Sequence, residues 1–474
     1  MLLPVASFLL LVLLLNWRKK GPVWALALSW LVCLLPIFLN LVSFRYLTDK
    51  DGLFSLILIG YLGSFVLGAW LYSLSRDLTM LHGHGRIMPV SPELLLAESR
   101  RVWPVAILCW WVAFGSTILN YVDFLLLGGE GLNDLAALRD TIVNRSSASI
   151  YGQIASLGTW ASMFCFIYGL LFRPQLHRWK FLLMMLPIFG FFSLSVLSAG
   201  RQTALQIMLL LLLVTLVSRN LQAGRNIGRR IRRKISRGEK FAIGLVSGLM
   251  ISYMGFIAVA RNDGSISDDK SVMLMQLFEF RFQPWVEQFF ANMGTGLRGA
   301  FVEGVIYFSS PVGLFENFLN QRWTMHWGET TFPFMARQLQ RFTGAPITPA
   351  FLDKVDTLNE SGVIGVGWTT SISSYILDYG YIGAILFMFV LGYYSQLAWI
   401  RLVSFRNFYD VVIGILVILN AIYMPLIPSY TETNIFLLWT VAILLSVAAG
   451  RRRHPAVATR GASGRAGMVA GPPA

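Results

Sequence analysis

Charged side chains are scarce in this chain of 474 residues, since Asp, Glu, Lys and Arg make up 13% of it while 55% is hydrophobic. Soluble domains carry roughly a quarter charged residues, so an ordinary soluble fold is excluded. Eleven apolar runs of about 16 to 24 residues occur, and a helix of about 20 apolar residues crosses the hydrocarbon core of a bilayer. The sequence therefore predicts an all-α polytopic membrane protein.

Cysteine is also scarce, and the sequence motifs of several enzyme classes are missing. The three cysteines, Cys33, Cys109 and Cys165, lie inside apolar runs at spacings that match no metal or redox motif, which argues against a disulfide framework or a zinc site. No Walker, GxSxG, HExxH or Rossmann motif occurs. Asp268 and Asp269 are adjacent but have no third ligand nearby. We therefore expect no metal and no cofactor.

The apolar runs define the expected domain organisation. The expected spans cover residues 1–16, 23–44, 52–75, 102–122, 152–172, 181–198, 202–218, 241–260, 379–400, 411–428 and 434–449. Residues 1–260 would hold eight transmembrane helices, 261–378 a large periplasmic loop, and 379–449 three further helices. Residues 450–474, rich in Gly, Ala, Pro and Arg, are expected to form a disordered basic tail.

The distribution of positive charge predicts the orientation of the chain. The connections after spans 1, 3, 5, 7 and 9, together with the tail, hold 26 of the 39 lysines and arginines. The positive-inside rule places this side in the cytoplasm and the N-terminus outside. The basic run 219–240 is then an orientation signal that meets anionic lipid headgroups, so no nucleic-acid partner is expected. The first run has its positive charges after it, which favours an N-out span over a cleaved signal peptide.

The long outer region between Ala260 and Gly380 should contain helices of its own, because a structureless loop of this length is unusual. Segments 271–282 and 328–342 mix apolar residues with Arg and Glu, which predicts amphipathic surface helices. A third interfacial helix is expected at 132–145. Tryptophans and charged residues alternate through the long region. Two interpretations stay open for most of them: a solvated loop with aromatics at the lipid interface, or a substrate site.

Several ionisable residues stand at the outer ends of the expected spans. Arg201 follows a very short turn at the hydrocarbon boundary, where an unpaired guanidinium is costly, and we favour an anion site there over a snorkelling anchor. Asp123, Asp378 and Glu432 either cap helices or pair with arginines, and capping is favoured for Asp378.

Three segments resemble the Wzy-type oligosaccharide repeat unit polymerases. SAGRQTALQIMLLLLLV at 198–214 resembles the family's small-residue turn with Arg before an apolar helix. FRFQPWVEQF at 280–289 resembles its Arg and Pro-Trp segment, and VGWTTSISSYILDYGYIGAILFMFVLGYY at 366–394 its last outer segment. The number of spans, the large outer loop and the basic inner connections agree over most of the chain.

The resemblance implies a helical fold of the type-C glycosyltransferase superfamily in the bacterial inner membrane, with a periplasmic active site. The implied reaction moves a growing glycan from undecaprenyl pyrophosphate to the nonreducing end of a lipid-linked repeat unit, without metal or nucleotide sugar. A chain-length regulator and a flippase are implied partners. By the same resemblance Arg201 and Arg281 would bind pyrophosphate, and Arg261, Arg298 and Arg322 are further candidates of the same chemistry.

The acceptor hydroxyl needs a proton acceptor, and four outer residues qualify as candidate bases: His326, Glu279, Glu287 and Glu303. His326 is the only histidine on the expected outer side, and an imidazole exchanges its proton near neutral pH. The flat rings of Trp285, Trp323 and Trp327 suit stacking on sugars. Two rival functions stay open: an O-antigen ligase that transfers glycan to lipid A core, favoured by His326, and a carrier for lipid-linked oligosaccharide.

Overall fold

The computed structural model describes a mostly helical chain over the following residues: 2–17, 21–44, 47, 52–80, 91–126, 149–197, 201–222, 280–291, 304–305, 308–343 and 370–451. Within them, five helical stretches are long and apolar enough to cross a membrane: Leu53–Ser75, Pro92–Leu126, Ile150–Leu171, Ser371–Val403 and Thr433–Gly450. The mostly helical fold and these apolar helices agree with the prediction of an all-α membrane protein. The number of eleven spans and the periplasmic position of the loop stay predictions.

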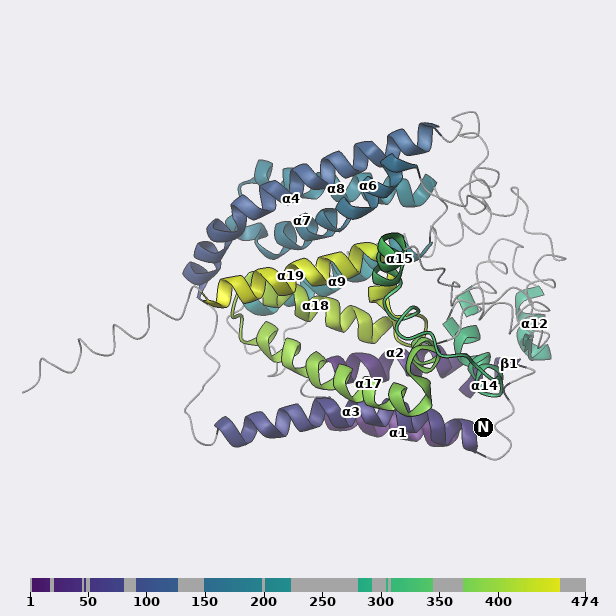
Figure 1. The fold of residues 1–474 in the computed structure, drawn as a ribbon. Helices are drawn as coiled ribbons and strands as arrows, with labels where there is room; N and C mark the ends of the chain where they lie inside the picture. Colours follow the sequence, from purple (N-terminus) through teal and green to yellow (C-terminus); the bar gives the residue numbers. More distant parts are fainter. Residues whose placement is uncertain are drawn as a thin grey trace, which may run out of the picture.

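The helices follow the apolar runs of the sequence closely (Figure 1). The bundle helices are α1 (Leu3–Asn16), α2 (Pro22–Phe38), α3 (Leu53–Met80), α4 (Pro92–Leu126), α6 (Ile150–Gly158), α7 (Trp160–Leu171), α8 (Arg178–Leu197), α9 (Arg201–Gln222), α17 (Ser371–Val403), α18 (Phe408–Tyr423) and α19 (Thr433–Arg451). Short 3-10 turns are η2 (Arg173–Gln175) and η3 (Ser429–Thr431). The expected span 241–260, the expected helix 132–145 and most of the tail lie outside the described residues.

A small antiparallel sheet corrects two of the expected helix boundaries. The run 23–44 was expected to be one span, but α2 ends at Phe38 and Asn40 adopts a left-handed φ of 51°. Strand β1 (Val42–Phe44) then pairs with β2 (Phe280–Phe282), with Ser43 opposite Arg281. Part of the expected amphipathic helix 271–282 is thus a strand. β-Branched and aromatic residues favour this extended pairing.

Proline and glycine explain two further differences. The run expected at 411–428 ends as a helix at Tyr423, because Pro425 and Pro428 follow and cannot continue it. Helix α17 begins at Ser371, earlier than the expected 379, and contains a kink at Gly380, where φ is 68°. Glycine tolerates this backbone conformation, so one continuous element bends at that point.

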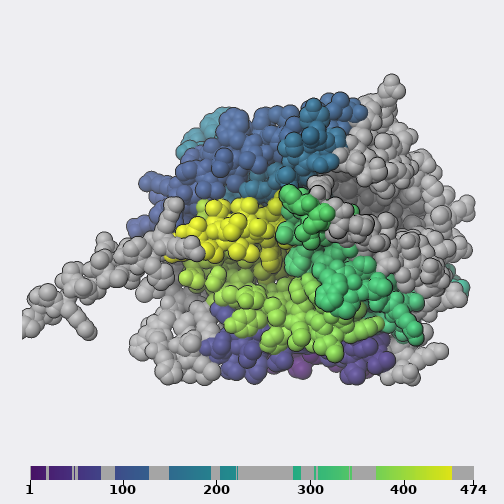
Figure 2. All heavy atoms as spheres, in the orientation of Figure 1, coloured from purple at the N-terminus to yellow at the C-terminus, as the bar shows by residue number. Residues whose placement is uncertain are grey.

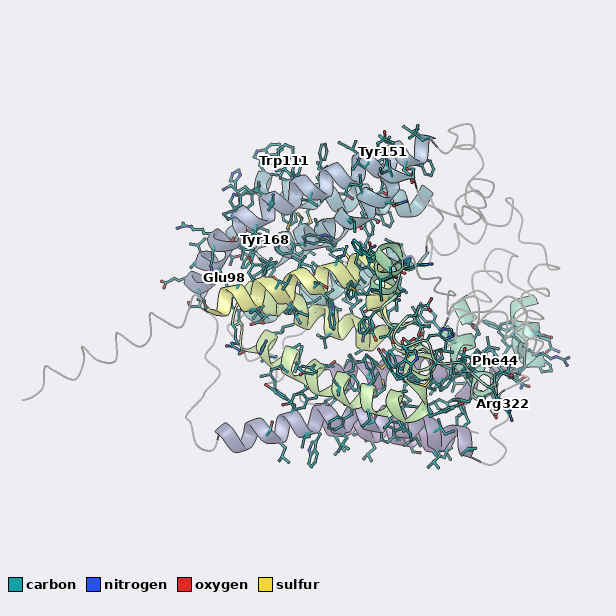
Figure 3. The ribbon with its side chains drawn as sticks, viewed as in Figure 1. Phe44, Glu98, Trp111, Tyr151, Tyr168 and Arg322 are labelled. Carbon is teal, nitrogen blue, oxygen red and sulfur yellow. The ribbon has the colours of Figure 1, made fainter. Side chains whose placement is uncertain are left out.

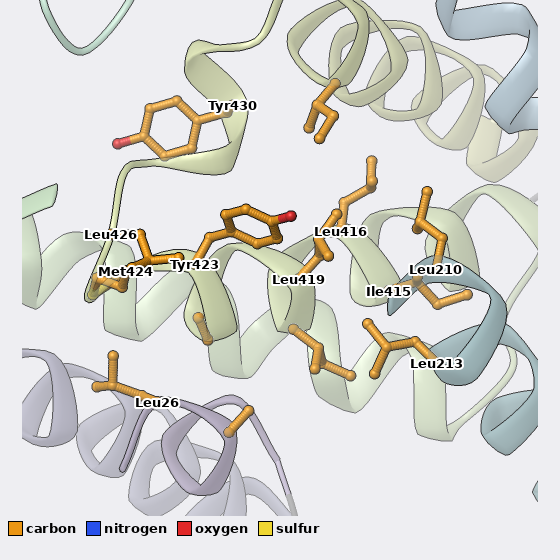
Figure 4. Close-up of a cluster of buried hydrophobic side chains, with 14 of the residues drawn as sticks. Leu26, Leu210, Leu213, Ile415, Leu416, Leu419, Tyr423, Met424, Leu426 and Tyr430 are labelled. Atoms are coloured by element: carbon orange, nitrogen blue, oxygen red, sulfur yellow. The ribbon is translucent and has the colours of Figure 1, made fainter. Parts of the chain in front are cut away.

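Helix α18 forms the centre of the bundle, since 14 of its 16 residues are buried. Figure 1 shows it between α17 and α19. In Figure 4 its apolar side chains lie between Leu26 of α2 and Leu210 and Leu213 of α9. The surrounding helices carry exposed apolar side chains, such as Trp111 of α4 in Figure 3, which is 62% exposed. An apolar outer surface of this kind suits a lipid environment.

The end of the bundle that carries the non-spanning segments is called the loop end here. It holds α12 (Pro284–Ala291), α14 (Phe315–Leu319) and α15 (Pro333–Thr343), which lie together with the sheet on the right of Figure 1. In Figure 2, α15 and the segment before it lie next to the ends of α17 and α19. The prediction that residues 261–378 contain helices is therefore confirmed for these segments, and α15 overlaps the expected amphipathic stretch 328–342 over residues 333–342.

Candidate functional site

The segment between α14 and α15, residues 320–332, is fastened to the first part of α17 by four hydrogen bonds. The Asp378 carboxylate is fully buried and accepts the backbone N–H groups of Thr330 at 3.0 Å and Thr331 at 2.5 Å. The Thr330 hydroxyl donates to the carbonyl of Ser374 at 2.7 Å, and the His326 N–H donates to the carbonyl of Leu377 at 2.9 Å. Hydrogen bonds to a carboxylate are among the stronger ones in proteins.

This arrangement corrects the capping role expected for Asp378. The residue lies within α17, and the N–H groups it accepts belong to a different segment. The kink at Gly380 follows two residues later, where the helix turns into its long apolar part. Asp378 is therefore a positioning residue for the segment 320–332.

His326 and Glu329 face each other in this segment. The His326 Nδ1 lies 3.6 Å from the Glu329 Oε2, and their side chains are 10% and 16% exposed. The Thr324 hydroxyl lies 3.4 Å from the other ring nitrogen, Nε2. Trp327 and Gly328 both have positive φ, 50° and 97°, and this turn folds the chain back so that Glu329 returns to His326. The pair is thus built locally and then anchored through Asp378.

The tryptophans of the predicted site differ in how much ring surface they present. Trp327 is 81% exposed and Trp285 on α12 is 58% exposed. Trp323 instead stacks on Phe318 with ring centroids 4.3 Å apart, and its indole N–H donates to the Phe318 carbonyl. One face of the Trp323 ring is therefore covered. The Trp327 ring is largely exposed, and Trp327 directly follows His326 in the chain.

The predicted cationic and acidic residues fall into two described groups. Arg281 on β2 and Glu287 on α12 are exposed and belong to the sheet corner. Arg322 is exposed and follows α14, close to the His326 turn. The sheet and α14 are in contact, because Phe44 of β1 packs on Gly313 just before α14. Arg281 and Glu287 thus belong to the sheet side of this region, whereas His326 belongs to the segment 320–332.

Five further predicted site residues have no described side chain. Glu279, Glu303, Arg261 and Arg298 lie outside the described residues. Arg201 is the first residue of α9, but its side chain is outside the described part of the chain. Their roles stay predictions.

A second polar group, missed by the sequence reasoning except for Glu432, lies beside the segment 320–332. Burial raises the pKa of Glu432, and the Arg337 guanidinium on α15 opposes this shift. Arg337 also donates to the Thr433 hydroxyl at 3.4 Å. Tyr430 donates its hydroxyl proton to Tyr375 at 2.8 Å, and burial raises the pKa of Tyr430 well above its ordinary value. The pairing of Glu329 with His326 could have been predicted from their spacing of three residues. The contacts of Arg337 on α15 with Glu432 and Thr433 depend on the fold and could not.

The chemistry available at the loop end is acid–base and stacking chemistry. An imidazole beside a carboxylate can take up a proton, and an exposed indole beside it can bind the face of a sugar. No protein-family model, no curated protein and no solved structure matches this chain. The geometry of these residues is therefore the main support for a function, together with the sequence resemblance.

Proposed function

We propose that this protein is a glycosyltransferase of the inner membrane that polymerises oligosaccharide repeat units at its periplasmic face. The observation that carries the proposal is the His326–Glu329 pair beside the exposed Trp327, in a segment that Asp378 fastens to α17. The resemblance of three segments to Wzy-type polymerases supplies the substrate class, undecaprenyl-pyrophosphate-linked oligosaccharide as both donor and acceptor.

His326 is proposed as the general base. A hydroxyl of the nonreducing-end sugar would give its proton to Nε2, because Nδ1 faces the Glu329 carboxylate. The hydroxyl oxygen then forms the new glycosidic bond at the anomeric carbon of the donor. The bond from that carbon to the pyrophosphate oxygen breaks, and its electron pair leaves with undecaprenyl pyrophosphate. The imidazolium formed on His326 would face the negative charge of Glu329, which stabilises it.

The pyrophosphate leaving group requires fixed positive charge. Arg322 is the described arginine nearest in sequence to His326, and its guanidinium is exposed. We assign pyrophosphate binding to Arg201, Arg281 and Arg322, with Arg261 and Arg298 as further candidates. Guanidinium forks bind phosphate oxygens bidentately and do so without a metal ion. Two lipid-linked substrates need two anionic subsites, which accounts for several arginines.

The test is a polymerisation assay with purified protein in lipid nanodiscs and undecaprenyl-pyrophosphate-linked repeat units, without nucleotide sugar. We expect a ladder of products spaced by one repeat. His326→Ala should lower the rate by about 100-fold or more, the usual contribution of a general base, and Glu329→Gln should lower it less. His177→Ala is the matched control, because His177 is exposed in the connection before α8. A full ladder from folded His326→Ala would remove His326 from catalysis.

An O-antigen ligase is the second candidate, because ligases of this architecture also carry a histidine in a large periplasmic loop. The same assay separates the two functions when lipid A core is added. Transfer that occurs only with lipid A core would establish the ligase. No transfer with either acceptor, from intact substrate and folded protein, would favour a carrier of lipid-linked oligosaccharide.

A further inference from the structure

A cavity lies between α17, α18 and α19. Its volume is about 440 Å³, and its lining includes Val390, Leu397, Ile413, Trp439 and Ile443. On α17 the lining begins at Phe387, whose ring stacks on Tyr379, and ends at Arg401 in the last turn of the helix. Because a helix rises about 1.5 Å per residue, the cavity extends roughly 20 Å along α17, away from the segment 320–332. Cavities of this size hold small molecules or lipid chains.

The cavity opens on the outside of the bundle between α17 and α19. Residues at its rim are partly exposed: Val390 at 47%, Tyr394 at 59%, Ile443 at 43% and Val447 at 52%. Figure 2 shows α17 and α19 on this outer face. An apolar opening on the flank of an apolar bundle is in contact with lipid chains when the bundle lies in a membrane.

One end of the cavity is polar and carries a guanidinium with an unused donor. Arg401, in the last turn of α17, lines the cavity, and its buried Nε has no hydrogen-bond partner among the described residues. Its Nη1 lies 4.0 Å from the Asp410 carboxylate, which is an ion-pair distance but not a hydrogen bond. A buried donor without a partner costs free energy, so a bound acceptor at this position would be stabilising.

Each oxygen of the Asp410 carboxylate already accepts a hydrogen bond from another side chain. One oxygen accepts the hydroxyl of Ser446 at 2.7 Å, and the other accepts the side-chain amide of Asn407 at 3.0 Å. The carboxylate is 3% exposed and belongs to the N-terminal turn of α18. Asp410 therefore holds Arg401 in place at the rim while leaving donors of the guanidinium for another partner.

We propose that this crevice binds a membrane phospholipid, with one acyl chain between α17 and α19 and the phosphate at Arg401. The apolar lining matches an acyl chain, and the guanidinium matches a phosphate in charge and in hydrogen-bond geometry. A second arginine, Arg406, is exposed just beyond the end of α17, and its backbone N–H donates to the Arg401 carbonyl. The polar end of the crevice is thus at the level where lipid headgroups lie, as interfacial arginines usually are.

The test uses a phosphatidylglycerol with a photoreactive diazirine on one acyl chain, incorporated into nanodiscs with the full-length protein. Mass spectrometry of the cross-linked peptides should place the label on 387–401 and 439–447. Arg401→Gln should lower labelling of these peptides by about tenfold, the loss of one charge-assisted hydrogen bond. Arg401→Lys should retain part of it, because the charge remains. Arg100→Gln, an exposed arginine on α4, is the matched control and should leave labelling unchanged.

Three results would overturn the proposal. Equal labelling of the wild type and Arg401→Gln, with both proteins shown to be folded by their melting temperatures, would exclude phosphate binding at Arg401. If a photoreactive diacylglycerol with the same acyl chain labelled these peptides as strongly as the phosphatidylglycerol does, phosphate binding at Arg401 would also be excluded. Displacement by undecaprenyl phosphate at a concentration where excess phosphatidylglycerol has no effect would mean that the occupant is a polyprenyl lipid.

Discussion

Gly392 of α17 lies directly against the backbone carbonyl of Phe65 in α3. The contact is reciprocal, because Gly68 of α3 lies against the carbonyl of Phe389 in α17. A Cβ atom at either glycine would collide with that carbonyl. Small residues at such positions let two helix backbones approach closely, a common way for apolar helices to associate in membranes.

Gly68→Ala and Gly392→Ala should each destabilise the protein by about 1–3 kcal/mol, the usual cost of overpacking. The carbonyl cannot move aside as a flexible side chain would, so α3 and α17 must separate. Thermal unfolding in detergent measures the effect. Gly60→Ala is the matched control on α3, because Gly60 is exposed and a Cβ atom added there would meet no neighbouring atom within 4 Å. Unchanged melting temperatures in both test variants would contradict the close packing of α3 and α17.

Asp378→Ala should release the segment 320–332 from α17. The substitution leaves the N–H groups of Thr330 and Thr331 without their acceptor, at a cost of about 1.5–3 kcal/mol for a hydrogen bond to a charged group. Limited proteolysis should then cut within 320–332 faster than in the wild type, and the proposed polymerase activity should fall with it. Glu93→Gln, an exposed carboxylate on α4, serves as the control. Cleavage of Asp378→Ala at the wild-type rate would show that other contacts hold the segment 320–332.

Glu98→Ala should destabilise the bundle at the end opposite the loop end. The Glu98 carboxylate of α4 is 4% exposed and accepts the N–H of Phe408 at the first residue of α18 at 3.0 Å. A carboxylate at a helix N-terminus is also stabilised by the helix dipole. We expect a loss of about 1–3 kcal/mol from thermal unfolding. Glu93→Gln again provides an exposed carboxylate for comparison, and equal effects of the two substitutions would exclude this role.

Glu432→Gln should make stability less dependent on pH. Burial raises the pKa of Glu432 above its ordinary value of 4.5, more than Arg337 lowers it. The folded state therefore holds this proton more tightly than the unfolded state. Its contribution to stability is complete below pH 4.5 and is lost as the pH rises to the folded-state pKa.

Melting temperatures of the wild type and Glu432→Gln across this range test the sign. The wild type should lose more stability than the variant as the pH rises, because glutamine cannot ionise. Arg337→Gln should steepen the wild-type decline, since it removes the charge that favours the ionised carboxylate. If the wild type instead gained stability relative to Glu432→Gln over this range, the pKa of Glu432 would be lowered by folding and not raised.

The helical apolar runs were readable from the sequence because their cause is local. Low charge and long apolar stretches predict α3, α4 and α19 without any knowledge of their neighbours. The end of α18 before Pro425 and the kink at Gly380 also have local causes, in proline and glycine. Neither was predicted from the sequence. The strand at Val42–Phe44 was missed because its partner, Phe280–Phe282, is more than two hundred residues away.

The residue types of the candidate site were also determined by the sequence: a histidine between tryptophans, with arginines in the same long region. Their arrangement was not, because it depends on contacts between distant segments. Asp378 receives the N–H groups of Thr330 and Thr331, Arg337 reaches Glu432, and Arg401 meets Asp410 across the turn between α17 and α18. Each of these pairings forms only when helices pack. The strength of an ion pair or hydrogen bond depends on burial and distance, and the tertiary structure sets both.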